Sequence, residues 1–189
     1  MDVTQAIENR RAYRSLEQVE ITKALIEDLA GHARLAPSCN NNQPWRFVFV
    51  HDPGTLVEMR AALSANNGWV HAASMIVAVF SRKEDDCVIK DREYDQFDCG
   101  LASAFLILRA TELGLVAHPI AGFSPKKTKE ILGIPEDYRV IALINVGKKA
   151  AALNPILTPK QIEEEKTRPG RKALDDFVFH NRYRSKVST

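Results

Sequence analysis

Met75-Ile76-Val77-Ala78-Val79-Phe80 is the longest apolar run of the chain, and it decides the fold class. β-branched and aromatic residues dominate the run, which favours a strand, and the lack of polar residues indicates that both faces of the strand are covered. The run is far shorter than the roughly 20 apolar residues that cross a bilayer. We therefore expect a sheet with helices packed against it.

Patterns typical of helices and strands alternate on both sides of this run. Ile21, Leu25 and Leu29 repeat every four residues, which predicts a helix with one buried stripe. Similar patterns predict helices over 2–9, 21–36, 95–113 and 125–132, a short helix that opens at Pro53, and strands over 45–50, 115–120 and 140–146. In the helix over 95–113, the residues expected to face inward are Phe97, Leu101, Ala104, Phe105 and Leu108. Helices that alternate with few strands predict an α/β or α+β fold with a mixed sheet.

The composition is that of an ordinary globular domain, with 189 residues, 45% hydrophobic side chains and a net charge of +2. The charges are spread along the chain, which argues against nucleic acid or an anionic membrane as the main partner. Residues 1–150 are predicted to form one domain. Residues 151–189 are polar and rich in proline, and we expect them to form a C-terminal arm with one helix that completes the same domain.

The sequence lacks the motifs of several common sites. It has no P-loop, GxGxxG or GxSxG pattern, and its histidines have no metal-ligand spacing, so no metal site is expected. Cys39, Cys87 and Cys99 form no CxxC pair, which favours free thiols in a reducing compartment. The N-terminal residues lack the apolar core of a secretory signal, so we expect a cytoplasmic protein. A cofactor would have to be held by arginines and backbone amides.

Arginines follow the first predicted helix in the segment Asn9-Arg10-Arg11-Ala12-Tyr13-Arg14. If that helix continues, Arg10 and Arg14 lie on one face, one turn apart, where two guanidinium groups can grip a phosphate. The alternative is that the arginines stabilise the negative end of the helix dipole.

A second segment, Ala36-Pro37-Ser38-Cys39-Asn40-Asn41-Asn42-Gln43-Pro44-Trp45-Arg46-Phe47, places amide and hydroxyl groups between two prolines. Such groups can satisfy the polar edge of a heteroaromatic ligand. The alternative is a helix-to-strand connection rich in turn-forming residues. Turn formation does not require Gln43-Pro44-Trp45 after the asparagines, so we favour a binding role.

Together the two segments resemble the FMN-dependent nitroreductase family, in which an RRSxR-type element precedes a PSxxNxQPW loop. Further segments match family patterns in the same order along most of the chain: Asn66-Asn67-Gly68-Trp69, Asp98-Cys99-Gly100 with Glu112-Leu113-Gly114-Leu115, Pro119-Ile120-Ala121-Gly122-Phe123, Leu132-Gly133-Ile134-Pro135-Glu136 with Asn145-Val146-Gly147, and Arg171-Lys172-Ala173-Leu174. The resemblance implies an α+β fold, with a mixed β-sheet flanked by helices. It also implies an intertwined homodimer with two FMN molecules at its interface.

The resemblance assigns cofactor roles to residues at matching positions. Arg10, Arg11 and Arg171 are expected to bind the FMN phosphate, and Lys172 is a further candidate. Ala12 stands in place of the family's serine, and its backbone N–H can still donate to the phosphate. Arg14 is expected near the ribityl chain or the N1/C2=O edge of the flavin, and Asn66 at its pyrimidine edge. Backbone amides of Ala121 and Gly122 are expected to face flavin N5. The residues expected to arrive from the partner subunit are Pro37, Ser38, Cys39, Asn41 and Gln43.

The activity that the resemblance implies is hydride transfer from NAD(P)H through FMN to a nitroaromatic, a quinone or a similar planar acceptor, by a ping-pong mechanism. The flavin would perform the redox step, so no catalytic side chain is expected. Trp69 stands where some members have a lysine, and Ala121 stands where a carboxylate is common, which affects donor and acceptor preference more than FMN binding. The polar segment 81–93 is expected to cover the pocket.

Other functions remain open from the sequence. One is a family member that oxidises or dehalogenates a dedicated metabolite. A second is an FMN-binding protein that stores or senses flavin without turnover, and a third is a scaffold without a cofactor.

Overall fold

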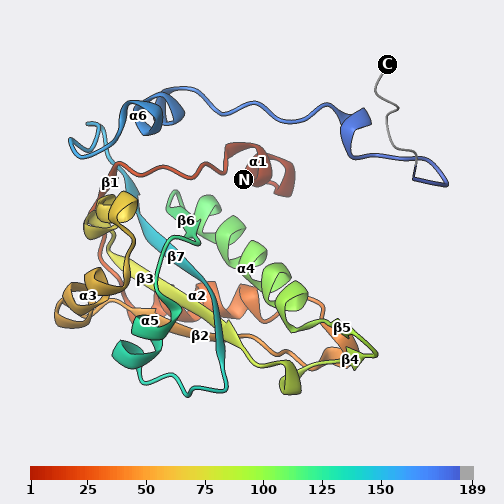
Figure 1. Ribbon diagram of the computed structural model, residues 1–189. Coiled ribbons are helices and arrows are strands. Elements are labelled where there is room, and N and C mark those ends of the chain that lie inside the picture. The colour runs from red at the N-terminus through yellow and green to blue at the C-terminus, as the bar shows by residue number, and fades with distance from the viewer. Residues whose placement is uncertain (184–189) are drawn as a thin grey trace.

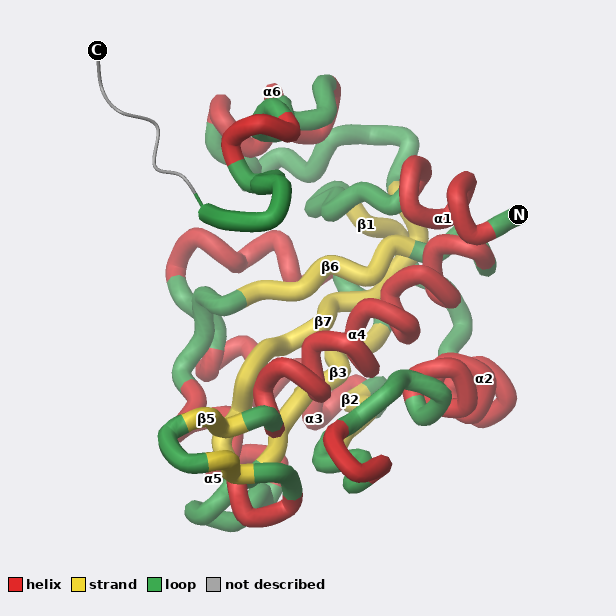
Figure 2. The backbone as a smooth tube through the Cα atoms, turned by 90° about the vertical axis from the view of Figure 1, so that its right-hand side faces the viewer, coloured by secondary structure: helices red, strands yellow, loops and turns green. Residues whose placement is uncertain are grey.

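The computed structural model describes residues 1–183, which adopt an α+β fold around one antiparallel sheet (Figure 1 and Figure 2). The helices are α1 Val3–Asn9, α2 Lys23–Ala33, α3 Pro53–Met59, α4 Asp95–Glu112, α5 Pro125–Leu132 and α6 Pro159–Lys166. The strands are β1 Leu16–Glu17, β2 Arg46–Val50, β3 Met75–Ser81, β4 Val88–Ile89, β5 Arg92–Glu93, β6 Val116–Ile120 and β7 Arg139–Lys149. The α+β class and the predicted main elements are confirmed, whereas the β4–β5 hairpin lies in a stretch predicted to be irregular.

The long strand β7 organises the sheet. It pairs with β3, β6 and β1, and β2 pairs with the other edge of β3. Every pairing among residues 1–183 is antiparallel, so the prediction of a mixed sheet is wrong. The chain passes from β3 through α4 to β6, a connection typical of parallel neighbours. Here, however, β7 lies between those two strands, with Ile144 paired to Val77 on one side and Pro119 on the other.

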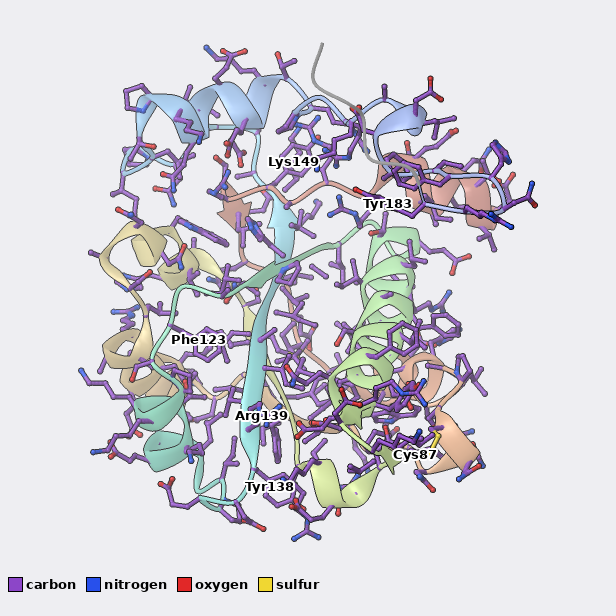
Figure 3. The ribbon with its side chains drawn as sticks, turned by 45° about the vertical axis from the view of Figure 1, so that its right-hand side comes forward. Cys87, Phe123, Tyr138, Arg139, Lys149 and Tyr183 are labelled. Carbon is purple, nitrogen blue, oxygen red and sulfur yellow. A yellow bond between two sulfur atoms is a disulfide. The ribbon has the colours of Figure 1, made fainter. Side chains whose placement is uncertain are left out.

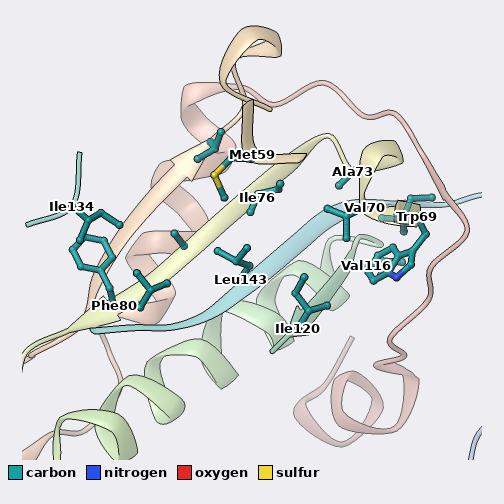
Figure 4. Packing of buried hydrophobic residues seen from close by; sticks show 14 of the residues in the cluster. Met59, Trp69, Val70, Ala73, Ile76, Phe80, Val116, Ile120, Ile134 and Leu143 are labelled. Atoms are coloured by element: carbon teal, nitrogen blue, oxygen red, sulfur yellow. The ribbon is translucent and has the colours of Figure 1, made fainter. Parts of the chain in front are cut away.

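Helices cover both faces of the sheet, as the apolar run in β3 predicts. Alternate residues of β3 enter two separate cores. Met75, Val77 and Val79 pack with α2 and α4, while Ile76, Ala78 and Phe80 pack in the core that includes Met59 and Trp69 (Figure 4). The strand is buried along its whole length.

The helix α4 packs on the sheet by a face other than the predicted one. Its buried residues are Asp95, Asp98, Cys99, Ala102, Leu106 and Ala110. Phe97 is 64% exposed and Phe105 is 38% exposed. The prediction followed the bulkier apolar stripe, but the small residues let α4 approach the sheet closely. Two phenylalanines of the bulkier stripe are therefore left exposed in the isolated chain.

The first helix ends earlier than the arginine hypothesis required. Asp2 and Gln5 form the predicted capping box, but Arg10 leaves the helix with φ −55° and ψ 121°. The prediction that Arg10 and Arg14 share a helical face is therefore wrong. The residues from Arg10 to Arg14 follow a path outside any helix.

The C-terminal segment returns to the beginning of the chain. After β7, the Ala150 N–H donates to the Ser15 carbonyl at 2.9 Å, and the Asn154 N–H donates to Ser15 Oγ at 3.0 Å. Thr158 and Gln161 form a capping box at the start of α6. Beyond α6 the chain passes α1 (Figure 1), where Arg168 donates a hydrogen bond to the carbonyl of Glu8. The two ends of the chain thus build one surface.

Candidate functional site

A pocket of about 180 Å³ lies where the N-terminal and C-terminal segments meet. Its lining is dominated by guanidinium groups and comprises Arg10, Arg11, Ala12, Arg14, Glu164, Arg168, Pro169 and Arg171. We call these eight residues the arginine pocket. The pocket exists only because α6 and the segment after it lie against residues 10–14.

Backbone hydrogen bonds from α6 hold the arginine-bearing segment in its path. Arg11 Nη2 donates to the carbonyl of Glu164 at 2.8 Å. The buried carboxylate of Glu165 accepts the backbone N–H of Arg14 at 2.5 Å and that of Ser15 at 3.4 Å. Arg11 Nη2 also lies 3.3 Å from the carbonyl of Glu165. Two carbonyls near the end of α6 and one carboxylate therefore hold residues 11–15.

The positive charges of the arginine pocket are only partly balanced. Arg14 Nη1 lies 3.0 Å from Glu164 Oε2. Within residues 1–183, Arg14 is the one arginine of the pocket that forms a salt bridge. Burial lowers the pKa of Arg10, and the neighbouring Arg168, Arg171 and Arg11 lower it further. Guanidinium groups that are held this close together without carboxylate partners have the chemistry to bind a small dianion such as a phosphate monoester.

A buried histidine adjoins this pocket. His118 in β6 donates from Nδ1 to the carbonyl of Tyr13 at 3.0 Å, since a carbonyl can only accept. Its ring stacks on Trp69 with ring centroids 4.6 Å apart. Burial lowers the pKa of His118 to about 4, and the charge of Arg14 acts in the same direction. The imidazole is therefore neutral at pH 7.

Trp69 links His118 to a tight contact between two loops. Trp69 Nε1 donates to Asn67 Oδ1 at 3.2 Å, and Asn67 Nδ2 donates to the carbonyl of Gly122 at 2.8 Å. A Cβ at position 122 would lie 2.5 Å from Asn67 Nδ2 and 2.6 Å from Ser64 Oγ, so any larger residue here would displace these two side-chain ends. The carbonyl of the neighbouring Asn66 accepts from Gln161 of α6 at 3.3 Å. Contacts therefore run from the arginine pocket to the Gly122 loop.

The asparagine-rich loop lies elsewhere in the chain. Three of its residues have left-handed backbone conformations, with φ 50° at Asn40, 57° at Asn41 and 51° at Gln43. Ser38 Oγ accepts the Gln43 N–H at 3.0 Å, and the Cys39 N–H donates to Asp98 Oδ2 at the start of α4 at 2.7 Å. The loop is thus anchored to α4 and contributes no residue to the arginine pocket of the same chain.

The predicted site residues fall into three groups in the structure. The arginine pocket contains Arg10, Arg11, Ala12, Arg14 and Arg171. A second group surrounds the contact between Asn67 and Gly122: Asn66 accepts from Gln161 of α6, Gly122 accepts from Asn67, and Ala121 precedes Gly122 in the chain. The residues outside both groups are Pro37, Ser38, Cys39, Asn41 and Gln43 in the asparagine-rich loop, and Lys172, which does not line the pocket. Their assignment to FMN stays a prediction.

Sequence reasoning missed Arg168, Glu164, Glu165 and His118. Arg168-Pro169-Gly170-Arg171 carries a usable signal, because two arginines flank a Pro-Gly pair that favours a turn. No local pattern marks His118, whose role follows from Tyr13, more than a hundred residues away in sequence. Glu165 lies in the run Glu163-Glu164-Glu165, a pattern typical of an exposed helix face, so no local signal marks it as buried.

The prediction of three free thiols is wrong for two of them. Cys39 and Cys87 form a disulfide, and Cys99 is free and buried. The pair is separated by 48 residues, so neither spacing nor the odd number of cysteines could reveal it. Figure 3 shows the sulfur–sulfur bond beside Cys87.

Comparison with known proteins identifies the family. The family model described as the nitroreductase family matches residues 7–67 and 55–148. The chain belongs to the nitroreductase family. No helix among residues 1–183 is long and apolar enough to span a membrane.

Several proteins show how far the similarity to other nitroreductase-family members extends. An Archaeoglobus fulgidus protein, whose name pairs NADH dehydrogenase with NAD(P)H nitroreductase, is 31% identical over 148 residues, or 75% of this chain and 82% of the relative. An iodotyrosine deiodinase of Haliscomenobacter hydrossis is 28% identical over 174 residues, with 77% and 78% covered. A crystal structure described as an oxidoreductase containing FMN superposes with a TM-score of 0.81 at 27% identity, covering 98% of this chain and 94% of the other. Nitroreductase-family relatives with oxidoreductase names thus match most of the chain.

The neutral His118 makes stability depend on pH. In the unfolded chain its pKa returns to about 6.5, so between pH 6.5 and 4 the unfolded state binds more protons and the fold loses stability as pH falls. At pH 4 the loss in free energy of unfolding that is due to His118 approaches about 3 kcal/mol. We expect the stability advantage of wild type over His118→Gln, measured by urea unfolding at pH 7 and at pH 4, to shrink by about this amount. An advantage that is equal at the two pH values contradicts a buried neutral imidazole.

Proposed function

We propose that the chain is an FMN-dependent oxidoreductase that passes hydride from NAD(P)H to a planar acceptor such as a nitroaromatic or a quinone. The observation that carries the proposal is the arginine pocket, in which Arg10, Arg168 and Arg171 have no carboxylate partner within residues 1–183. FMN differs from riboflavin by the phosphate that such a pocket fits. Bound FMN supplies hydride transfer chemistry, and the protein supplies position and charge.

The residues of the chain have distinct proposed roles toward FMN. Arg10, Arg11, Arg168 and Arg171 bind the phosphate, with the N–H of Ala12 as a further donor and Lys172 as a cation beside them. Arg14, kept in place by Glu164 at 3.0 Å, presents its charge near the N1/C2=O edge, where a cation stabilises negative charge. Asn66 and the backbone of Ala121 and Gly122 meet the polar edge and N5. His118 is neutral and so adds no second positive charge beside Arg14.

The exposed apolar surface supports a homodimer. A hollow of about 330 Å³ between α1, α2 and α4 is lined largely by apolar residues, among them Val3, Leu35 and Phe105. Phe97 on α4 and Leu174 in the C-terminal segment are also exposed. A second copy that covers these side chains would bring the loop residues Pro37, Ser38, Cys39, Asn41 and Gln43 to the FMN of its partner. We propose that each FMN site is completed in this way.

A second candidate concerns the acceptor. The relative named iodotyrosine deiodinase favours reductive removal of halogen from an aromatic metabolite as the reaction of the same site. Release of iodide from an iodinated phenol by the reduced protein, with no turnover of nitroaromatics or quinones, would support this candidate over the first.

The purified protein tests the function directly. We expect it to be yellow or to become yellow with added FMN, and to lose its visible absorbance anaerobically on addition of NADH or NADPH. Steady consumption of NAD(P)H with menadione then shows turnover. A yellow protein that neither donor bleaches points to flavin storage or sensing, and a colourless protein without affinity for FMN ends the proposal.

Arg10→Ala tests the phosphate assignment. Loss of one partner of a partly buried charge pair costs about 2–5 kcal/mol, so we expect FMN affinity to fall by at least about thirty-fold. Affinity for riboflavin, which lacks the phosphate, should be unchanged in the same variant. Arg34→Ala, an exposed arginine after α2, serves as the matched control. Both affinities are measured by flavin fluorescence, and full retention of FMN contradicts the role of Arg10.

Phe105→Glu tests the homodimer. Phe105 lines the apolar hollow on α4, and a charge there has to be desolvated if a second copy covers it. We expect the wild type to sediment at twice the 21.2 kDa chain mass and the variant to dissociate on dilution. Val57→Glu changes an exposed residue of α3 and should leave the mass unaltered. A wild type that sediments as a flavin-loaded monomer would refute the shared site.

A further inference from the structure

The disulfide joins two surface segments that belong to different parts of the fold. Cys39 lies in the asparagine-rich loop between α2 and β2, and Cys87 lies just before β4. Both cysteines are half-buried, so thiols in solution can reach the bond. In Figure 3 the bond lies at the end of α4 that is next to the hairpin, on the side of the molecule facing away from α6.

The hairpin that follows Cys87 has few other attachments. β4 and β5 pair through two residues each, Val88 with Glu93 and Ile89 with Arg92. Val88 is 52% exposed and Ile89 is 42% exposed, so neither supplies a core contact. A two-stranded ribbon without a buried face is marginally stable in water. Glu93 of β5 also lies 3.5 Å from Arg139 of β7 in an ion pair. Together with this ion pair, the disulfide is a principal restraint on residues 88–93.

The two sulfurs differ in their surroundings. Cys87 Sγ accepts hydrogen bonds from Asn40 Nδ2 at 3.4 Å and Asn42 Nδ2 at 3.6 Å. Two amide donors stabilise a thiolate at Cys87, which makes this sulfur the better leaving group. The loop brings both amides to Cys87 because Asn40 adopts a left-handed conformation.

A carboxylate lies close to both sulfurs. An oxygen of Asp86 and both sulfurs lie within 4.8 Å of one another. Asp86 Oδ2 is buried and has no hydrogen-bond partner among residues 1–183. Asp98, which binds the Cys39 N–H, has its pKa raised by burial and by Asp86. Close to these acids, a cystine that leaves no charge on sulfur is favoured. The two sulfurs are distinguished by the amides of Asn40 and Asn42, which donate to Cys87 Sγ and can stabilise a thiolate there.

We propose that Cys39 and Cys87 form a redox-active thiol–disulfide site whose reaction partner is a dithiol. One thiolate of the dithiol attacks Cys39 Sγ, the bond between the two cysteine sulfurs breaks, and its electron pair leaves on Cys87 Sγ. The second thiolate then attacks the mixed disulfide at the sulfur of the dithiol and releases Cys39. The dithiol is oxidised to its disulfide, and the cysteine pair gains two electrons and two protons.

Reduction releases the hairpin from the asparagine-rich loop. Exposed disulfides are reduced more easily than buried structural ones, so a half-buried disulfide between two surface segments can act as a reversible restraint. If the loop packs against bound FMN of a partner, which rests on the proposed function, reduction also loosens that contact. The site itself needs no flavin to react.

Differential alkylation followed by mass spectrometry tests the exchange. In protein purified without reductant we expect Cys39 and Cys87 to be protected and, after dithiothreitol under native conditions, both to be labelled together. Cys99, whose pKa burial raises to about 12, stays unlabelled in both states, and Cys99→Ala is the control variant. A pair that is already labelled after treatment with oxidised glutathione, or that excess dithiothreitol leaves protected in the native protein, overturns the proposal.

Asn42→Ala tests which sulfur leaves. Asn42 has φ −71°, so alanine fits the backbone. The Asn42 amide donates to Cys87 Sγ at 3.6 Å and to Asp86 Oδ1 at 3.2 Å. Its loss removes a donor to the Cys87 thiolate and a donor that offsets the Asp86 charge beside it, and both changes should slow reduction, by about five-fold for one lost hydrogen bond. An unchanged rate contradicts Cys87 as the leaving group.

Limited trypsin digestion detects the release of the β4–β5 hairpin and needs no flavin measurement. We expect cleavage after Lys90 and Arg92 to rise by about ten-fold on reduction, while cleavage after Lys126 and Lys127 in α5 stays constant. Cys87→Ser should be cut at the fast rate with or without dithiothreitol. Equal rates in the oxidised and reduced wild type overturn the restraint even if FMN binds, and failure of FMN binding leaves this result unaffected.

Discussion

The buried carboxylate of Glu165 is the contact on which the arginine pocket depends. It accepts backbone N–H groups from Arg14 and Ser15, while the chain just before it accepts the guanidinium of Arg11. Guanidinium groups repel one another, so bringing Arg10, Arg168 and Arg171 together costs free energy. The hydrogen bonds between α6 and the N-terminal segment supply the compensating interaction. Residues about 150 positions apart must be brought together before the site exists, so the site forms only in the completed fold.

The arginines of the pocket differ in how far their positive charge is balanced by a carboxylate. Arg14 has Glu164 as its partner, so its orientation is fixed before any ligand arrives. Arg10 is half-buried among other arginines and has no carboxylate partner in the part of the chain that the structure describes. Preorganised charge of this kind favours a ligand that carries two negative charges on one small group. The neutral imidazole of His118 adds no further cation beside Arg14.

Sequence patterns predicted the elements well, because local physics fixes them. Asp2, Ser124 and Gly133 begin or end helices at the expected positions through side-chain caps and a positive φ. The errors concern choices that depend on distant residues. The face of α4 was assigned by bulk, although Ala102 and Ala110 are the residues that let it approach the sheet. The position of β7 between β3 and β6 also has no local signal.

The residues of the candidate site also divide into those that local patterns or the family resemblance predicted and those that depend on contacts distant in sequence. Arg10, Arg11, Arg14 and Arg171, which line one pocket, were predicted as site residues because the family resemblance links motifs from both chain ends; their role stays a prediction. Arg168, Glu165 and His118 were missed, because each acts on backbone groups far away in sequence. The disulfide was missed for the same reason, since 48 residues separate its cysteines.

The close packing at Gly122 couples substitutions at positions 64, 67 and 122. A methyl group at 122 would displace Asn67 Nδ2 and Ser64 Oγ, and Trp69 would then lose the acceptor for its indole N–H. A larger residue at 122 therefore needs room from the side chains of Ser64 and Asn67. Substitutions at these three positions are expected to depend on one another.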